Sequence, residues 1–439
     1  MNRFKKYLVF FILFIVICSS FSNVLAVSLA EKTAELEKNI GSEAVLIMES
    51  STGKVIYEKN GYAKKYPAST TKILTAILAI EHCNLDESAT ASEFAITSIP
   101  SGYSTANIQI GETLSVKDLL NVLMIQSANE AAVILAEHVS GSVEAFSVLM
   151  NQKAEEIGCK NTHFVNANGV HSDNHYTTCY DLALIADYAM KNKTFRDIVK
   201  TTSYTLPATT AYPAESRTFM NTNNLIIPDF RNKSDNYYYE YATGIKTGYT
   251  TPAKNCLVSS AEKNGIKYIC VVLGAGTPYI NGEVVSYRYV DSISLFNYVF
   301  DNFSFRKLRA EKDNIKTIEI KNAKKGSNEL RLLIASDVDA LVSIDNKNSE
   351  IEPTIQLKDD LKAPISKGDI VGSISYKVEG LEYTTDLIAA NSVEEYKTNY
   401  TWVYVLVAGF VVLVLIVVGI RFYNHRKKHS RNRTKYIIK

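Results

Sequence analysis

The sequence lacks several features that would place it in a specialised protein class. Its six cysteines show no close pairing. Because Cys18 lies in a segment expected to be removed, the odd number that remains argues against a disulfide framework. There is no internal repeat and no low-complexity tract, and the composition, 46% hydrophobic and 21% charged, argues against disorder, collagen and coiled coils. The seven histidines show no recognised metal-ligand spacing, so no metal site is expected.

Acidic residues are missing from both ends of the chain. Residues 1–26 hold three basic residues and no acid, and residues 402–439 hold eight basic residues and no acid. The middle, 27–401, therefore carries all 46 acidic residues against 37 basic ones, a net charge of −9. A body with this charge is a poor binder of polyanions, so no nucleic-acid partner is expected.

The N-terminal segment has the organisation of a secretory signal peptide. A basic start is followed by an apolar run over 7–18 and by the small-residue cleavage pattern Val24-Leu25-Ala26. We therefore expect residues 1–26 to be removed on export, and we exclude them from the reasoning about the fold.

A second apolar segment, 402–420, holds 19 residues without a charge. As a helix it would be roughly 28 Å long, about the thickness of one hydrocarbon core. The basic tail 421–439 follows immediately, and the positive-inside rule places such a tail in the cytoplasm. The sequence thus predicts a single-pass protein of the cell membrane whose main body is extracytoplasmic.

Residues 27–305 are predicted to form an α+β domain. Short apolar strands at 44–48 and 55–57 form one hairpin, and strands at 256–260 and 266–273 form another around the turn Asn264-Gly265. Helical spacing of apolar residues fills the region between them. Strands at both ends with helices between them predict one antiparallel sheet built from both ends of the domain, accompanied by helices. Residues 310–396 instead show short strands separated by polar turns, which predicts a small all-β domain.

The segment that contains Ser69 and Lys72 is the first candidate for catalysis. Ser-x-x-Lys at a helix start puts both side chains on one face, one turn apart, with the serine near free backbone N–H groups. An apolar helix follows Lys72, so its ammonium is expected to be partly desolvated, which lowers its pKa and lets it take the serine proton. The same spacing recurs at Ser51, Ser260 and Ser304, but without this context.

Two further motifs carry side chains suited to a substrate. Ser127-Ala128-Asn129 interrupts two helical stretches, so its hydroxyl can relay protons and its amide can bind a peptide carbonyl. Lys246-Thr247-Gly248 is expected on a strand, where Lys246 and Thr247 can hold a carboxylate and Gly248 lets a substrate approach the backbone.

Ser-x-x-Lys, Ser-Asp-Asn and Lys-Thr-Gly together are the signature of penicillin-binding proteins and class A β-lactamases. With "YPASTTKILTA" at 66–76, "IQSANEAAVILAEHVSGS" at 125–142 and "TGIKTGYT" at 243–250, the chain resembles the low-molecular-mass penicillin-binding proteins that act as D-alanyl-D-alanine carboxypeptidases. The resemblance implies a penicillin-binding or β-lactamase-like catalytic domain followed by a β-rich domain. It departs from the family in its Ser-Ala-Asn motif, in Lys254, where relatives carry a small residue, and in its transmembrane rather than amphipathic C-terminal segment.

The resemblance also implies an activity. Ser69 would attack the penultimate D-Ala carbonyl of a peptidoglycan stem peptide with Lys72 as base, while the backbone N–H groups of Ser69 and Tyr249 stabilise the oxyanion. Ser127 would pass a proton to the leaving D-Ala, and water would release the acyl-enzyme. The remaining motif residues would bind the substrate: Asn129, Lys246, Thr247 and Gly248. β-Lactam antibiotics would acylate the same serine, and no cofactor is needed.

Three other functions share these motifs. A D,D-transpeptidase or endopeptidase differs only in which acceptor or substrate reaches the acyl-enzyme. A class A β-lactamase needs a glutamate for deacylation, and no Glu-x-x-Leu-Asn lies between Ser127 and Lys246. A non-catalytic β-lactam receptor needs an intracellular signalling domain, for which the short tail after Ile420 leaves no room. The sequence therefore favours the carboxypeptidase.

Overall fold

The computed structural model describes residues 28–228 and 237–434. The expected signal peptide, 1–26, and residues 435–439 of the basic tail lie outside the described residues. The chain divides into two compact units. The first holds the chain up to Arg306 together with Leu341–Ser349, and the second holds Lys307–Ala340 and the chain from Glu350 onward.

The first unit is built on a five-stranded antiparallel sheet in the order β2-β1-β9-β8-β7. The strands come from both ends of the domain, as the sequence predicts, and Asn264-Gly265 forms the turn between β8 and β9. The bounds are β1 Ala44–Glu49, β2 Val55–Lys59, β7 Ala242–Thr250, β8 Lys254–Lys263 and β9 Ile266–Ala275.

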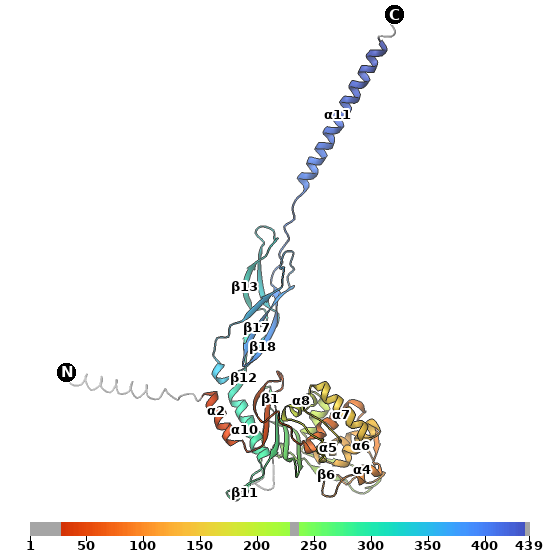
Figure 1. Ribbon diagram of the computed structural model, residues 1–439, viewed down its shortest axis with the longest axis vertical. Helices are drawn as coiled ribbons and strands as arrows, with labels where there is room; N and C mark the ends of the chain where they lie inside the picture. Colours follow the sequence, from red (N-terminus) through yellow and green to blue (C-terminus); the bar gives the residue numbers. More distant parts are fainter. Residues whose placement is uncertain (1–27, 229–236, 435–439) are drawn as a thin grey trace, which may run out of the picture. The chain divides into compact units, whose positions relative to one another are not determined.

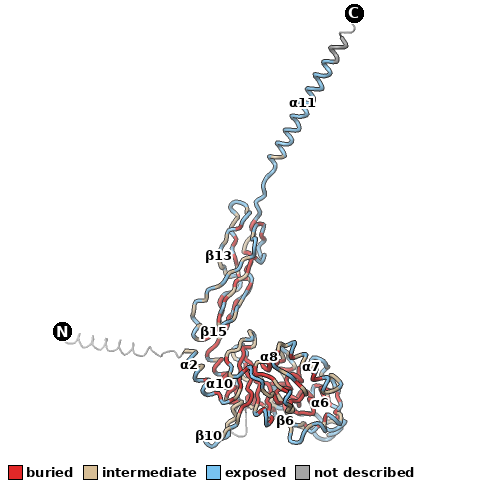
Figure 2. The backbone as a smooth tube through the Cα atoms, in the orientation of Figure 1, coloured by how far each residue is buried: buried red, intermediate tan, exposed pale blue. Residues whose placement is uncertain are grey.

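Helices cover both faces of this sheet (Figure 1). Along β1, Leu46 and Met48 point into a core shared with the larger group of helices, whereas Val45 and Ile47 point into a second core on the opposite face. This alternation is why every residue of β1 is buried. In Figure 2 much of the sheet is coloured as buried. The larger group comprises α3 Lys72–His82, α4 Glu93–Thr97, α5 Val116–Ile125, α6 Asn129–Ser140, α7 Val143–Ile157, α8 Cys179–Met190 and α9 Lys193–Val199.

The opposite face is covered by α2 (Leu29–Asn39) and α10 (Tyr287–Asn302). The sequence reasoning placed helices only between the two groups of strands, so it missed both of these. They flank the sheet-forming strands in the sequence and close the second core with Leu36, Leu295 and Phe296.

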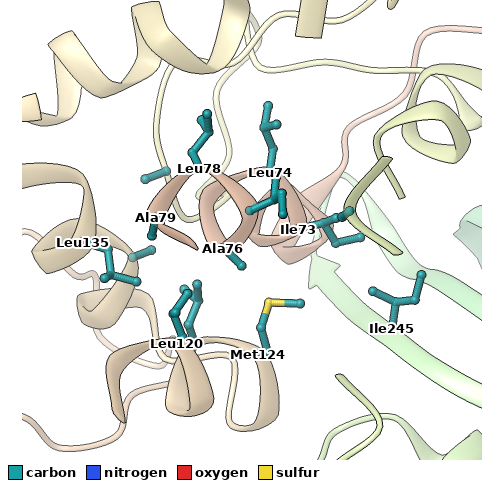
Figure 3. Close-up of a cluster of buried hydrophobic side chains, with 14 of the residues drawn as sticks. Ile73, Leu74, Ala76, Leu78, Ala79, Leu120, Met124, Leu135 and Ile245 are labelled. Carbon is teal, nitrogen blue, oxygen red and sulfur yellow. The ribbon is translucent and has the colours of Figure 1, made fainter. Parts of the chain in front are cut away.

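Helix α3 is central to the larger core. Figure 3 shows its Ile73, Leu74 and Ala76 among side chains from α5, α6 and β7. All positions from Lys72 to Ala79 are buried, so this helix is fixed from every side. Small elements complete the unit: η1 Ala68–Thr71, η2 Asn224–Ile226, η4 Ile344–Asn346, β3 Ser88–Thr90, β4 Thr113–Ser115, β5 Ser203–Leu206, β6 Arg217–Met220, β10 Tyr279–Ile280 and β11 Glu283–Val284.

The second unit contains a five-stranded antiparallel sheet in the order β13-β14-β18-β17-β16, in agreement with the expected all-β character. Strand β16 was not predicted, because it is a four-residue strand at the sheet edge with no buried residue. The bounds are β13 Asn314–Glu319, β14 Glu329–Ile334, β16 Thr354–Leu357, β17 Ile370–Val378 and β18 Leu381–Ala389. Strands β12 (Phe303–Arg309) and β15 (Val338–Ser343) form a separate two-stranded sheet, and the division between the two units falls within each of them.

The chain then enters α11 (Thr401–Thr434), which is longer than the predicted segment 402–420. Among the described residues, this is the one unbroken helix that is long and apolar enough to cross a membrane, over Thr401–Lys428. Its most apolar stretch is not buried against any other part of the described chain. A long, exposed, apolar C-terminal helix of this kind fits a membrane anchor.

Candidate active site

Ser69 lies in a short turn at the start of the central helix. The turn η1 runs directly into α3, which puts Ser69 and Lys72 on the same side. The Nζ atom of Lys72 lies 2.8 Å from Ser69 Oγ, 2.9 Å from Asn129 Oδ1 and 2.6 Å from the backbone oxygen of Asn168. The structure thus brings the first two motifs into direct contact through one amine.

The environment of Lys72 favours the neutral amine. Its side chain is fully buried, and this burial lowers its pKa well below 10.5; the positive charge of Lys246 lowers it further, while Glu130 opposes the shift. The desolvation expected from the apolar helix after Lys72 is therefore present, and it is complete rather than partial.

Ser127 occupies the corner between α5 and α6. Its φ of +64° lies in the left-handed region, which turns the chain sharply between the two helices. The backbone N and the Nδ2 atom of Asn129 donate to Ser104 O at 3.0 and 2.9 Å. Because Asn129 Oδ1 accepts from Lys72, this side chain links the corner to both the catalytic helix and the loop that holds Ser104.

Strand β7 passes directly beside the Ser69 turn. A Cβ atom on Gly248 would lie 3.1 Å from Ser69 N and 3.1 Å from Pro67 O, so glycine permits this close approach. The Oγ1 atom of Thr247 lies 2.6 Å from Thr222 Oγ1.

Lys246 is buried, and its Nζ donates to Thr247 O at 3.1 Å. Burial, together with the charge of Arg288, lowers the pKa of Lys246 to about 7.

These elements surround a cavity of about 340 Å³. Lys72 and Lys246 do not line it, because both are buried next to it. The other site residues predicted from the sequence all do. The lining residues are Ser69, Gly102, Tyr103, Ser104, Ser127, Asn129, Thr222, Thr247, Gly248, Tyr249, Thr250, Thr251 and Arg288.

Sequence reasoning missed Arg288, which enters the cavity from the first turn of α10. Its guanidinium lies 4.8 Å from the ring centre of Tyr289, and its Nε is buried without a hydrogen-bond partner among the described residues. A cation that lines the same cavity as Thr247 is suited to an anionic group of a ligand. No motif in the sequence marks this arginine, because it follows the last strand of the sheet by more than ten residues.

The loop between α7 and α8 supplies three more residues that were not assigned roles. Asn168 gives its backbone oxygen to Lys72. Gly169 has φ +82°, and a Cβ there would lie 1.9 Å from Ala68 O. His175 Nε2 lies 2.8 Å from Thr71 Oγ1, which donates to Ala68 O at 2.8 Å. The loop therefore supports the turn that carries Ser69, and the block "NANGVHSDNH" was the available signal.

Lys254, noted as a departure from the family, does not line the cavity. Its Nζ lies 2.6 Å from Glu43 Oε1, while Lys65 Nζ lies 2.5 Å from Glu43 Oε2. Glu43 thus joins the start of β8 to the segment that precedes Ser69.

Comparison with known proteins agrees with this arrangement. A family model described as D-alanyl-D-alanine carboxypeptidase matches residues 30–277, and one described as the C-terminal domain of penicillin-binding protein 5 matches residues 303–395. The D-alanyl-D-alanine carboxypeptidase DacF of Bacillus subtilis is 30% identical, over 82% of this chain and 87% of that protein. DacC of Escherichia coli is also 30% identical, over 83% of this chain and 87% of its own length.

A crystal structure of penicillin-binding protein 5 from Haemophilus influenzae superimposes with a TM-score of 0.62 at 26% identity, covering 81% of this chain and 98% of that one. Fold and family models together define a serine hydrolase with the penicillin-binding fold. The chain belongs to the D-alanyl-D-alanine carboxypeptidase family of serine peptidases.

Proposed function

We propose that this chain removes the terminal D-alanine from peptidoglycan stem peptides through an acyl-enzyme on Ser69. The observation that carries the proposal is the set of three contacts around Lys72 Nζ. Two of the partners, Asn129 Oδ1 and Asn168 O, are carbonyl oxygens and can only accept hydrogen bonds. A neutral amine has two N–H donors, so both are used, and its lone pair is left for the Ser69 hydroxyl.

This arrangement makes Lys72 the general base. Transfer of the Ser69 proton to Nζ frees the oxygen to attack the penultimate D-Ala carbonyl. The backbone N–H groups of Ser69 and Tyr249 stabilise the oxyanion, since β7 lies close against η1 at Gly248. Ser127, on its strained corner, passes the proton to the departing D-Ala nitrogen. Water then releases the shortened peptide from Ser69.

The terminal carboxylate is held at the Thr247 side of the cavity. Thr247 offers a hydroxyl already aligned by Thr222, and Arg288 offers a cation with an unpartnered donor. Lys246 adds positive charge from its buried position, and a bound carboxylate favours its protonated form. Asn129 retains one Nδ2 hydrogen for a peptide carbonyl of the stem.

The same chemistry makes β-lactams acylating agents of Ser69, as they are for the family in general. Of the alternatives weighed above, the comparisons favour the carboxypeptidase over a β-lactamase or a receptor. A transpeptidase or endopeptidase would use the same residues on a different acceptor or substrate.

We further propose that α11 crosses the cell membrane once, with the tail from 421 onward in the cytoplasm and the catalytic unit outside. The long apolar helix and the basic residues that follow it support this topology. Export by the N-terminal segment, 1–26, would deliver the unit to its peptidoglycan substrate.

A matched pair of serine variants tests the proposed function. Ser69→Ala should abolish both covalent labelling by fluorescent penicillin and D-alanine release from a pentapeptide. Ser51→Ala should leave both unchanged, because Ser51 has the same spacing to Lys54 but lies in the β1–β2 turn, bonded to Glu49. Normal labelling of a folded Ser69→Ala protein would contradict the assignment.

A further inference from the structure

Three potential metal ligands meet at the ends of α3 and α6 that lie away from the catalytic residues. Cys83 is the C-terminal cap of α3, and His138 lies in the last turn of α6. Glu87 lies in the turn that leads into β3. Each side chain therefore comes from a different element of the fold.

The ligand atoms of these residues lie close together. One atom from each, the Cys83 sulfur, a Glu87 carboxylate oxygen and a His138 ring nitrogen, lie within 4.8 Å of one another. Glu87 Oε2 is 3.2 Å from His138 Nε2. The other carboxylate oxygen, Oε1, accepts from the backbone N and Nδ2 of Asn84 at 3.1 and 2.8 Å. That turn anchors one oxygen of Glu87 and leaves the other facing His138.

We propose that Cys83, Glu87 and His138 bind a zinc ion. A thiolate, an imidazole nitrogen and a carboxylate oxygen are the three ligand types that zinc takes in proteins, with a water molecule completing a tetrahedron. Tetrahedral bonds of about 2.0–2.3 Å require ligand atoms roughly 3.3–3.8 Å apart, so small side-chain rotations from the present separations suffice. Binding releases the Cys83 proton to solvent, and the neutral imidazole supplies a nitrogen lone pair.

The position of the site gives it a structural role. Helix α3 begins at Lys72 and α6 begins at Asn129, the two residues joined by a hydrogen bond at the catalytic end. The ion would join the opposite ends of the same two helices, roughly 16 Å away along α3. It would therefore stabilise the pairing of these helices without touching substrate.

Sequence spacing gives no signal for this site. Cys83 and Glu87 are four residues apart across a helix end and a turn, and His138 follows more than fifty residues later. The four other cysteines among the described residues are buried, so Cys83 is the thiol that a metal ion can reach.

Cobalt(II) provides a direct test, because a thiolate ligand gives a charge-transfer band in the near ultraviolet. We would titrate Co²⁺ into the full-length, chelator-treated and reduced protein in detergent. The expected result is one Co²⁺ per chain, a charge-transfer band that Zn²⁺ removes, and a higher melting temperature with Zn²⁺. Cys83→Ser should lose the band, and Glu87→Gln and His138→Gln should each weaken binding by about tenfold or more.

His82→Gln is the matched control, since His82 is the exposed neighbour of Cys83 and is not part of the cluster. It should bind Co²⁺ as the parent protein does. Penicillin labelling of every variant shows that the catalytic unit is folded. Absence of the band in the parent protein, or its survival in Cys83→Ser, would overturn the proposal. Co²⁺ binding by Glu87→Gln and His138→Gln that is as tight as in the parent protein would also overturn it.

Discussion

At the scale of single residues, the two buried lysines have different electrostatic roles in the mechanism proposed above. Lys72 is bonded to Ser69 and needs to be neutral to act as a base, whereas Lys246 is bonded to β7 and its positive charge helps to make Lys72 neutral. Burial lowers the pKa of each, and protonation of one disfavours protonation of the other.

The coupling predicts a pH effect. Because the folded pKa of Lys72 is lowered, the rate of acylation by penicillin should rise with pH through an apparent pKa well below 10.5, as Lys72 loses its proton. Lys246→Met removes a positive charge, so the pKa of Lys72 should increase and this rise should move to higher pH. Stopped-flow measurements of acylation by penicillin across the pH range give the pH of this rise in both proteins.

The maximal rate of acylation will also fall in Lys246→Met, but the informative quantity is the pH at which the rate rises. If the acylation rate rises at the same pH as in the parent protein, or at a lower pH, the two lysines do not interact as described.

His175 is predicted to act as a positioning residue. The backbone N of Val165 donates to Nδ1 at 3.2 Å, so Nε2 carries the proton that it donates to Thr71 Oγ1. Thr71 in turn holds Ala68 O, next to Ser69. Burial lowers the pKa of His175 to about 3, so this chain of hydrogen bonds persists at all ordinary pH values.

His175→Ala should therefore lower kcat by roughly tenfold to a hundredfold, with a smaller change in KM, since the nucleophile is displaced rather than the substrate. His175→Gln, whose amide nitrogen can replace Nε2, should restore much of the rate. Steady-state kinetics on a D-Ala-D-Ala peptide provide both numbers. If both variants lose stability and activity in parallel, the role is structural only.

The motifs could be found from the sequence because the residues of each lie a few positions apart, on one element or where one element runs directly into the next. Ser69 with Lys72, and Lys246 with Thr247, are of this kind. His175 acts on Thr71 from 104 residues away, and Arg288 comes from the opposite face of the sheet, so no local pattern connects them to the site. Asn168 contributes a backbone oxygen, which its residue type does not encode.

At the scale of elements, the Ser69 turn is held between β7 and the loop after α7. Each neighbour approaches through a glycine, Gly248 on the strand and Gly169 on the loop. The approach of the loop is the closer one, because a Cβ on Gly169 would overlap Ala68 O, whereas one on Gly248 would only crowd Ser69 N. The conformation of η1 therefore depends on two elements far apart in the sequence.

Gly169→Ala should for this reason impair acylation strongly. Gly53→Ala is the matched control, because Gly53 also has positive φ, +69°, but a Cβ there would contact nothing within 4 Å. Both substitutions should cost about 1–2 kcal/mol of stability from backbone strain. Gly169→Ala should cost more than Gly53→Ala, because the overlap of its Cβ with Ala68 O must also be relieved. Only Gly169→Ala should also lower the rate of penicillin labelling by tenfold or more. Similar labelling rates would show that the turn does not depend on the loop.

Helix α10 shows the limit of element prediction. The pattern of strands at both ends predicted the antiparallel sheet, because four of its five strands carry short apolar runs joined in pairs by turn signals, while β7 was expected from its Lys-Thr-Gly motif. The sequence reasoning looked for helices only between the two groups of strands and so did not infer the second layer. The unbroken apolar run of β1, all six residues of which are buried in the structure, was the available signal for a sheet covered on both faces.

At the scale of the whole molecule, the apolar helix α11 is the proposed membrane anchor. Segment 402–420 has no polar face along which a helix could lie on a membrane, so we expect it to span. The full-length protein should need detergent for extraction, and high salt or alkaline carbonate should not release it. Membrane fractionation after each treatment, followed by penicillin labelling, shows whether the protein stays with the membrane.

A chain ended after Tyr400 should instead be secreted and soluble, with unchanged D-alanine release from a small peptide, since the cavity lies wholly within the first unit. Protease added outside intact cells should leave the tail beyond Arg421 intact. Release of the full-length protein by carbonate would restore the surface-lying anchor of its relatives as the better interpretation.

The free cysteines have a consequence for how the protein would fold after the export proposed above. All five in the described residues are thiols, and four of them are packed inside the first unit. No covalent cross-link has to form among them, so maturation does not draw on oxidative folding enzymes or on an electron acceptor. An enzyme of this kind, exported as proposed above, can reach its native state equally well in an anaerobic, strongly reducing habitat and in an aerated one.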